Sequence, residues 1–477
     1  MNLADITARI LALDSWVWQP FVMPIVLVLV GGLITVMTGV VQIRRFPVAL
    51  QMLRRGAFVK RREGAKTITP FQALSTALAA TVGNGNIGGV ATAIVIGGPG
   101  AIFWMWVCAA VGMATKYAEA VLGVHYRVTR ENGELASGPM YYISRGVGGG
   151  LGRTLAYMFA FFGAAAALFG TGNMAQSNTV ARTFVEASRV AGFPVSTWVP
   201  GVLITVLVGL VLLGGIRRIA AVAEKLVPTM ILVYVTAAVA YIVLNVGDLP
   251  RVFGLIFAEA LSPTAAIGGF AGATVAQSIA AGMSRGVLSN EAGLGSAPIA
   301  HGIAEVKHPA EQGTVGILEV FIDTIVVCSM TAFVILSSGL WTEAQFQGSS
   351  GDLTAAAMST TIPGASFIVA LSSFLFGFST LIAWYYYGEK CFEFLFGSRA
   401  VPAYRMLFVV LILIGALIEV RLAWAIGTLL NGFMAFPNLV GLLFLLGMVR
   451  RITRDYFAKG GGEFSVAHPT TGARVGR

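Results

Sequence analysis

The chain has 477 residues, of which 56% are hydrophobic and only 11% are charged, and its 32 basic and 22 acidic residues give a formal net charge of +10. Soluble domains carry about 25% charged residues, so this sequence has too few to cover a water-exposed surface. Disorder is excluded because disordered segments are poor in large apolar residues. Three cysteines and four histidines argue against a disulfide scaffold and a transition-metal centre, and no cofactor is expected. A multi-spanning membrane protein remains.

The chain begins with a segment that differs from the apolar runs behind it. Residues 1–20 place Asp5, Arg9 and Asp14 among Leu, Ile and Trp, which predicts an amphipathic helix lying at the membrane surface rather than a signal peptide. Spanning the hydrocarbon takes about 20 mostly apolar residues, and eleven later segments qualify. They are centred in 21–43, 70–97, 99–124, 154–176, 197–215, 226–245, 264–283, 312–340, 365–391, 404–420 and 424–449.

The basic residues gather on alternate connections between these spans. The stretches that hold 26 of the 32 Lys and Arg are 44–66, 127–153, 217–225, 285–307, 390–405 and 450–477. Short cytoplasmic loops carry the excess of Lys and Arg, and an odd number of spans places all these stretches on one side. The sequence therefore predicts a multi-pass protein of a bacterial-type inner (plasma) membrane, with the N-terminus outside and the C-terminus cytoplasmic. Basic residues so dispersed around apolar helices do not indicate nucleic-acid binding.

A glycine-rich motif at 83–88, Gly-Asn-Gly-Asn-Ile-Gly, matches the dinucleotide-binding fingerprint. That fingerprint requires a preceding strand and an acidic residue about 20 positions later. No Asp or Glu lies between Glu63 and Glu119, and the flanks are apolar, so the dinucleotide interpretation fails. Helix packing through Gly85 and Gly89, four residues apart, is a second interpretation.

Packing does not account for Thr81, Asn84 and Asn86, which lie about 17–24 Å into the span at 1.5 Å per residue. Glycines and amides form a poor helix centre, so the motif predicts a broken helix, which lipid tolerates only where the freed backbone lines a cavity or site.

A second interruption at 267–278 mixes Gly with Thr, Gln and Ser. Without the first span, ten spans remain, and the two interruptions fall in the first helix of each set of five. Because five is an odd number, the two sets must have opposite orientations in the membrane. Paired broken helices in inverted halves indicate a secondary transporter with a midplane site.

The expected organisation follows from this pairing. The surface segment 1–20 precedes an extra N-terminal spanning helix and a basic cytoplasmic loop at 21–69. The first inverted repeat occupies 70–245, the second 246–449, and a basic cytoplasmic tail 450–477. The fold class is thus an all-α integral membrane protein of about eleven spanning helices in a five-plus-five inverted repeat, and the oligomeric state stays open.

Five separated motifs carry a resemblance to a known family. TVGNGNIGGVATA at 81–93, GGPGAIFWMW at 97–106, GMATKYAE at 112–119, GPMYY at 138–142 and SNEAGLGSAPIA at 289–300 together resemble the alanine or glycine:cation symporter family, the sodium:alanine symporters. The resemblance runs from about residue 20 to 450. It implies the five-plus-five fold of sodium-coupled amino-acid transporters with one additional N-terminal helix, and symport of a small neutral amino acid with sodium across the bilayer.

The resemblance also implies site residues. Backbone N–H groups around Asn84 and Gly85 would meet the substrate carboxylate. The carbonyls of Ala79 and Val82 would face sodium together with the hydroxyls of Ser379 and Thr380, although Ser and Thr in a membrane helix otherwise bond the carbonyl four residues back. The complete set expected around the substrate is Gly83, Asn84, Gly85, Asn86, Gln176, Phe270, Gly272, Thr274, Gln277 and Trp384. The polar cluster around Gln176 fits an outer-interface position equally well.

Charged residues within spans complete the candidates. Intramembrane carboxylates by default suggest a functional site, so Asp323 is a possible cation or proton site, with a buried structural acceptor as the alternative. Lys116 and Glu119, three residues apart, are expected to pair with each other or with a loop. Proton-coupled amino-acid transport is the nearest alternative function, for which Asp323 is the main support. A passive channel is less favoured, and an enzyme is not expected because no nucleophile–base or metal grouping lies within a span.

Overall fold

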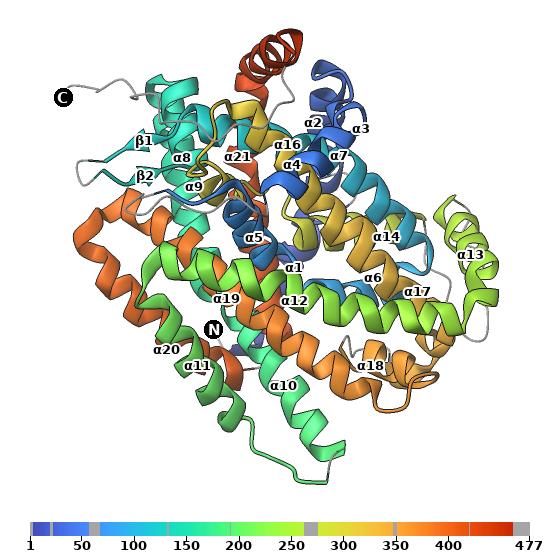
Figure 1. Ribbon diagram of the computed structural model, residues 1–477. Helices are drawn as coiled ribbons and strands as arrows, with labels where there is room; N and C mark the ends of the chain where they lie inside the picture. Colours follow the sequence, from blue (N-terminus) through green and yellow to red (C-terminus); the bar gives the residue numbers. More distant parts are fainter. Residues whose placement is uncertain are drawn as a thin grey trace.

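The computed structural model describes residues 3–19, 22–56, 67–130, 133–190, 192–261, 275–346, 351–418 and 420–460. It is helical almost throughout, as Figure 1 shows, apart from a short antiparallel ribbon of β1 (Val128–Thr129) and β2 (Leu135–Ala136). The helices in the first half are α1 (Leu3–Val17), α2 (Met23–Met37), α3 (Val41–Arg44), α4 (Phe46–Gly56), α5 (Pro70–Thr81), α6 (Val90–Gly97), α7 (Gly100–His125), α8 (Pro139–Tyr142), α9 (Gly149–Phe169), α10 (Met174–Val190), α11 (Trp198–Leu212) and α12 (Gly215–Leu244).

The second half is built in the same way. Its helices are α13 (Leu249–Leu261), α14 (Val275–Asn290), α15 (Pro298–His301), α16 (Pro309–Val320), α17 (Ser329–Ser338), α18 (Gly351–Ser359), α19 (Ala365–Phe396), α20 (Val401–Leu417) and α21 (Val420–Ala458). Wider π-helical turns occupy Gly85–Gly89, Ile143–Val147 and Phe321–Cys328, and 3₁₀ turns occupy Val246–Asp248, Leu340–Thr342, Ala344–Phe346 and Ser398–Ala400. The π segment at Phe321–Cys328 joins α16 to α17, and π turns frequently mark functional sites.

The membrane-spanning character is confirmed. Within the described residues, seven segments are long and apolar enough to cross a bilayer, namely Gly100–His125, Gly149–Arg189, Gly215–Leu244, Pro309–Ser338, Ala365–Phe396, Ser398–Leu417 and Trp424–Ala458, and a bent pair supplies an eighth. Two further expected spans form the shorter apolar helices α2 and α11, of 15 residues each. The expected span at 264–283 lies partly outside the described residues, so the total of eleven and the inverted repeat stay predictions.

The predicted helix break is confirmed. α5 begins with a capping box, in which the Thr69 side chain accepts from the backbone N–H of Gln72 and the Gln72 side chain accepts in return, and it ends at Thr81. The chain resumes at Gly85 and continues into α6 at an angle of 52°. Successive glycines and amides have low helix propensity, which explains why the break falls here and not in the Ala-rich flanks.

The expected span at 154–176 lies within the apolar segment Gly149–Arg189, and a turn interrupts it. α9 ends at Phe169, and α10 begins at Met174 after a turn. A side chain on Gly170 would lie 2.6 Å from the backbone of Gly427, so glycine permits a close approach to α21 at this turn. The polar cluster behind it is buried rather than at an outer interface: Asn173 donates to the carbonyl of Phe408 at 2.9 Å.

The charged residues inside the bundle form pairs with residues far away in the sequence, rather than with their neighbours on the same helix. Lys116 on α7 forms its ion pair with Glu319 on α16, with Nζ and Oε1 3.0 Å apart, and not with Glu119. The second Glu319 oxygen lies 2.9 Å from Nε2 of His301, and all three side chains are fully buried. α7 and α16 are therefore joined by a buried charged contact, which a low dielectric strengthens.

Glu119 instead contacts the loop that follows α14. A contact with a loop was one of the two pairings expected from the sequence. Its Oε1 accepts from the backbone N–H groups of Gly293 and Gly295, both at 3.1 Å, and from Asn438 of α21 at 2.7 Å. Both glycines have positive φ, of 91° and 82°, which side chains rarely tolerate. One buried carboxylate thus fixes the loop against α7 and α21.

Candidate functional site

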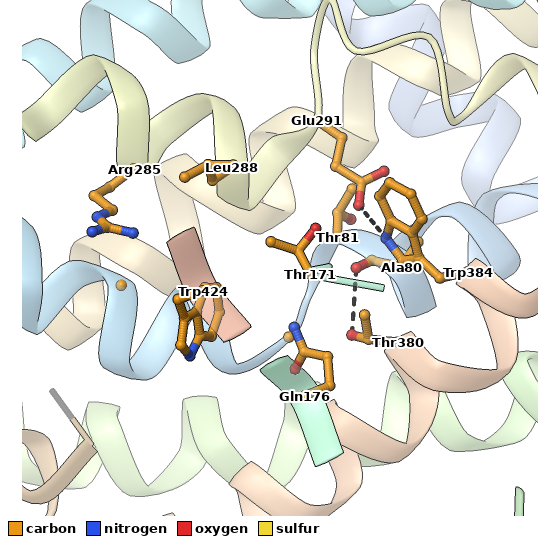
Figure 2. Close-up of a pocket in the computed structure, with 13 residues that line it drawn as sticks. Ala80, Thr81, Thr171, Gln176, Arg285, Leu288, Glu291, Thr380, Trp384 and Trp424 are labelled. Atoms are coloured by element: carbon orange, nitrogen blue, oxygen red, sulfur yellow. Dashed lines mark hydrogen bonds between the residues drawn. The ribbon is translucent and has the colours of Figure 1, made fainter. Parts of the chain in front are cut away.

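A small pocket lies at the break between α5 and α6. Figure 2 shows its walls, which come from the break, the turn before α10, α10 itself, α14, α19 and α21. Its lining residues are Ala80, Thr81, Gly83, Gly85, Gly89, Thr171, Gln176, Arg285, Leu288, Glu291, Thr380, Trp384 and Trp424. The cavity measures about 20 Å³, close to the space one water needs. The side chains therefore nearly close over the break.

The backbone at the break contributes Gly83 and Gly85 to the lining of this pocket. Gly83 N–H is held by Oδ1 of Asn86 at 2.8 Å, and Asn86 N–H donates to the carbonyl of Gly83 at 3.1 Å. The first N–H groups of a helix have no partner within it, and here that helix begins at Asn84 and Gly85. These groups and the helix dipole favour an anionic group.

Amide side chains brace the break from α10 and α19. Nδ2 of Asn84 donates to Oε1 of Gln176 at 3.0 Å, and Oδ1 of Asn84 accepts from the hydroxyl of Ser373 at 2.6 Å. Because its oxygen is occupied, the Gln176 amide keeps its NH₂ group for other partners, and the residue lines the pocket. The structure thus brings Gln176 to the break, while the Asn84 side chain acts as a brace.

Glu291 is a pocket residue to which the sequence assigned no role. It follows α14 in a left-handed conformation, with φ of 56°, which is uncommon for any residue except glycine. Its carboxylate accepts from Nε1 of Trp384 at 2.7 Å and from the hydroxyl of Ser296. Figure 2 shows the carboxylate directed toward Trp384, beside Ala80 and Thr81. Backbone strain of this kind persists at functional sites because surrounding contacts hold it.

Of the four residues expected around sodium, only Thr380 lines the pocket. Thr380 Oγ1 lies 2.9 Å from the carbonyl of Phe376 and 3.4 Å from that of Ala80, rather than at Ala79. Ser379 also donates to the Phe376 carbonyl, at 2.9 Å. Both hydroxyls therefore make the ordinary back-bond of a membrane helix, which uses their protons and leaves oxygen lone pairs available. Ala79 and Val82 are fully buried but do not line the pocket.

Asp323 lies behind the break, outside the pocket, on the π segment between α16 and α17. Oδ1 accepts from Nδ2 of Asn86 at 2.6 Å, and Oδ2 accepts from the hydroxyls of Ser289 and Thr324, both at 2.8 Å. Among the described residues no Lys or Arg forms an ion pair with it. Asn86 therefore links the break to a buried carboxylate instead of facing the pocket.

Of the candidates in the second interruption, the structure describes only Gln277, which does not line the pocket. Phe270, Gly272 and Thr274 lie outside the described residues. Gln277 is exposed near the start of α14, whereas the pocket is lined by Arg285 of the same helix. Eight residues separate Gln277 from Arg285, which is about 12 Å along a helix, and this places Gln277 beyond contact with the break.

The end of the pocket that Arg285 and Trp424 line approaches helix α1. Thr428 of α21 donates to Oδ1 of Asp14 at 2.5 Å, and Nε1 of Trp18 donates to the carbonyl of Thr428 at 3.1 Å. Burial raises the pKa of the Asp14 carboxyl, while the Thr428 hydrogen bond and the nearby charge of Arg285 act in the opposite direction. Because Arg285 also lines the pocket, α1 adjoins the site.

A helix broken in mid-span, with a polar pocket at the break among spanning helices, is typical of secondary transporters. A solved structure of the Eremococcus coleocola manganese transporter, in complex with an aromatic bis-isothiourea substituted compound, matches 85% of this chain and 90% of that chain with a TM-score of 0.51 and 13% identity. At that identity the likeness concerns the fold alone.

Sequence relatives identify the family. The chain is 43% identical to the sodium/alanine symporter AgcS of Methanococcus maripaludis over 456 residues, covering 95% of this chain and 97% of the relative. It is also 43% identical to an uncharacterized transporter of Haemophilus influenzae over 450 residues, covering 94% and 95%. The model of the sodium:alanine symporter family matches residues 3–465. The chain belongs to the sodium:alanine symporter family, which confirms the resemblance in the sequence and supports a transporter rather than an enzyme.

Replacing Gly83 by Ala tests the geometry of the break. The added Cβ would lie 2.7 Å from Oγ1 of Thr380, and overpacking of this kind costs about 1–3 kcal/mol. We expect alanine binding by the purified protein to weaken by roughly tenfold or more. The control is Gly209→Ala on α11, where an added Cβ meets no atom within 4 Å. Equal affinity in the Gly83→Ala and Gly209→Ala variants would contradict this account of the pocket.

Proposed function

We propose that this protein is a sodium-coupled symporter that carries a small neutral amino acid, alanine or glycine, into the cell by alternating access. The observation that carries the proposal is the pocket at the break, which combines a helix N-terminus with a buried carboxylate. An amino-acid zwitterion needs both a site for its carboxylate and a site for its ammonium group. Membership of the sodium:alanine symporter family supports the cation and the substrate class.

The substrate orientation follows from these two ends. The carboxylate of the amino acid meets the N–H groups of Asn84 and Gly85, where the dipole of the second half-helix favours negative charge, and the free amide donors of Gln176 add to this. The ammonium group meets Glu291, the single carboxylate among the described pocket-lining residues. The hydrogen bond from Trp384 holds that carboxylate toward the break.

The pocket walls support a small substrate. Gly83 and Gly85 contribute no side chain, and Trp384 closes one wall opposite Thr171 and Trp424. The unfilled volume of about 20 Å³ means that even alanine enters only as these side chains move apart. A large side chain would demand a larger displacement. Substrate entry therefore requires movement of the pocket walls, as expected for alternating access.

Sodium is proposed to lie beside the substrate, between α5 and α19. Hard cations prefer oxygen ligands, and the carbonyls of Ala79 and Val82 with the hydroxyls of Ser379 and Thr380 supply only oxygen. Thr380 Oγ1 already lies 3.4 Å from the carbonyl of Ala80, so the two helices approach each other closely here. A bound cation would draw these oxygens together and tie α19 to the broken helix.

The proposed orientation in the membrane rests on the basic connections. Arg54 and Arg55 lie in the last turn of α4, and Arg450, Arg451 and Arg454 lie near the end of α21. The positive-inside tendency places such ends in the cytoplasm. The protein then lies in a bacterial-type inner membrane, with α1 on the outer side. The substrate pocket adjoins α1 through Arg285 and therefore approaches the outer side.

Proton coupling is the second candidate, and Asp323 favours it. A fully buried carboxylate with no ion-pair partner among the described residues is energetically costly when charged. Binding of a proton or a cation would lower that cost. Asn86 connects Asp323 directly to the break. Replacing Asp323 by Asn would abolish coupling under this alternative, whereas sodium-driven uptake that survives Asp323→Asn would exclude it.

Uptake of labelled alanine into proteoliposomes tests the proposed coupling. The zwitterion carries no net charge, so co-transport with one sodium ion moves one positive charge, worth about 2.3 kcal/mol per 100 mV. We expect uptake to require an inward sodium gradient and to rise with an inside-negative potential. Uptake driven equally well by a proton gradient in sodium-free buffer would contradict sodium coupling and favour the proton alternative.

Glu291→Gln tests the ammonium contact. Glutamine keeps an oxygen that can accept from Trp384 but removes the negative charge, so the affinity for alanine is expected to fall by about tenfold or more, the range for a hydrogen bond to a charged group. Binding of propionate, which lacks the amino group, should not weaken, because the substitution removes a negative charge near this anion. Glu311→Gln on α16, outside the pocket, is the matched control. Unchanged alanine affinity in the Glu291→Gln variant would show that the ammonium group binds elsewhere.

A further inference from the structure

A second pocket, distinct from the one at the break, lies between the end of α2 and the end of α21, which adjoin near the top of Figure 1. It measures about 350 Å³. Four arginines line it, together with apolar and small residues, and the full lining is Met37, Thr38, Gly39, Val41, Arg44, Arg45, Arg450, Thr453, Arg454, Phe457 and Ala458. We propose that this basic pocket binds the phosphate headgroup of an anionic membrane phospholipid.

The charge of the pocket is unbalanced. Among the described residues, no acidic side chain lines the pocket, and neither Arg44 nor Arg450 forms an ion pair with a carboxylate. Arg454 approaches only its neighbour Asp455, at 3.6 Å, and both are exposed. Guanidinium groups bind phosphate oxygens through paired hydrogen bonds. An anionic phosphate is thus the complementary ligand.

The pocket is held in shape by contacts across three helices. The Arg45 guanidinium lies 4.0 Å from the ring centre of Phe457, a cation–π contact that joins the residue after α3 to α21. Tyr117 of α7 donates to Thr453 at 3.0 Å behind the pocket. These contacts hold Arg45 and the last turns of α21 against the rest of the helix bundle.

The turn before α3 carries backbone strain. Gly39 and Val40 both have positive φ, of 68° and 55°, and this conformation is a genuine outlier for a β-branched residue. The turn ends α2 and redirects the chain, which brings Arg44 to the pocket; its Nη1 lies 3.4 Å from the position that a Cβ on Gly39 would take. Strain retained at such a turn is consistent with a binding role.

The position along α21 suits a lipid headgroup. The apolar part of this helix begins at Trp424, and Arg450 lies 26 residues later, about 39 Å along the axis. The hydrocarbon core is about 30 Å thick and the whole bilayer about 40–45 Å, so Arg450 falls in the headgroup layer. Apolar side chains beside the pocket are left open for acyl chains: Val36 is 74% exposed and Ile43 69% exposed. Arginines at headgroup depth beside exposed apolar residues favour a phospholipid over a free phosphate ion.

Native mass spectrometry of the full chain in mild detergent tests the proposal, with phosphatidylglycerol and phosphatidylethanolamine as the added lipids. The purified wild-type protein should retain phosphatidylglycerol in preference to phosphatidylethanolamine. The double variant Arg450→Gln/Arg454→Gln should lose this preference by about tenfold or more, since each basic residue adds a comparable increment at an anionic surface. Arg217→Gln/Arg218→Gln removes the same charge from exposed positions at the start of α12 and should retain it.

Two further measurements complete the test. Arg44→Gln changes the opposite wall of the pocket and should weaken phosphatidylglycerol retention even if the α21 double variant fails to fold. Inorganic phosphate added at millimolar concentration should not displace the lipid, whereas displacement would show a site for free phosphate. Equal retention of phosphatidylglycerol by the wild type, the Arg44→Gln variant and the α21 double variant would overturn the proposal.

Discussion

An interrupted helix within an apolar bundle must find partners for the backbone groups that the interruption frees, because lipid supplies none. Here the interruption at residues 82–84 is braced on two sides. The side chain of Asn86 holds the N–H of Gly83, and Gln176 and Ser373 hold the side chain of Asn84. The N–H groups that remain at the start of the second half-helix are the feature on which the proposed substrate site depends.

Buried carboxylates organise what surrounds this break, each by a different means. Glu319 is neutralised by Lys116, and removing one partner of such a pair costs about 3–5 kcal/mol. Glu119 is stabilised by backbone and amide donors, and it fixes the loop that contains Gly293. That loop places Glu291 at the pocket. Buried contacts made by α7 therefore help to position Glu291, the carboxylate that is proposed to meet the substrate. α7 itself does not line the pocket.

Sequence reasoning predicted the features that depend on local composition. The all-α spanning architecture follows from apolar runs of the required length, and the break follows from the low helix propensity of Gly83 to Gly85; both are confirmed. The family resemblance is confirmed as well. What the sequence missed depends on contacts between distant residues. Lys116 pairs with a residue 203 positions away, and nothing in the spacing of its neighbours predicts that partner.

Glu291 illustrates the same limit. The run of Asn, Glu, Ala and Gly at 290–293 was part of the family motif, and a carboxylate beside glycines in an apolar chain was a signal that could have been followed. Its role depends on Trp384, which lies 93 positions later. The turn between α9 and α10 shows a similar long-range dependence, since Gly170 lies close to the backbone of Gly427, a residue far away in the sequence.

The central claim is that the amino acid and the coupling cation meet at this single break. The most direct test is calorimetric titration of the purified protein with alanine, in sodium and in sodium-free buffer, together with the reverse titration of sodium with and without alanine. Linked sites must show reciprocal effects. The account predicts that sodium strengthens alanine binding by the same factor by which alanine strengthens sodium binding, and that Thr380→Val reduces this factor toward one. Alanine affinity that is the same with and without sodium would contradict it.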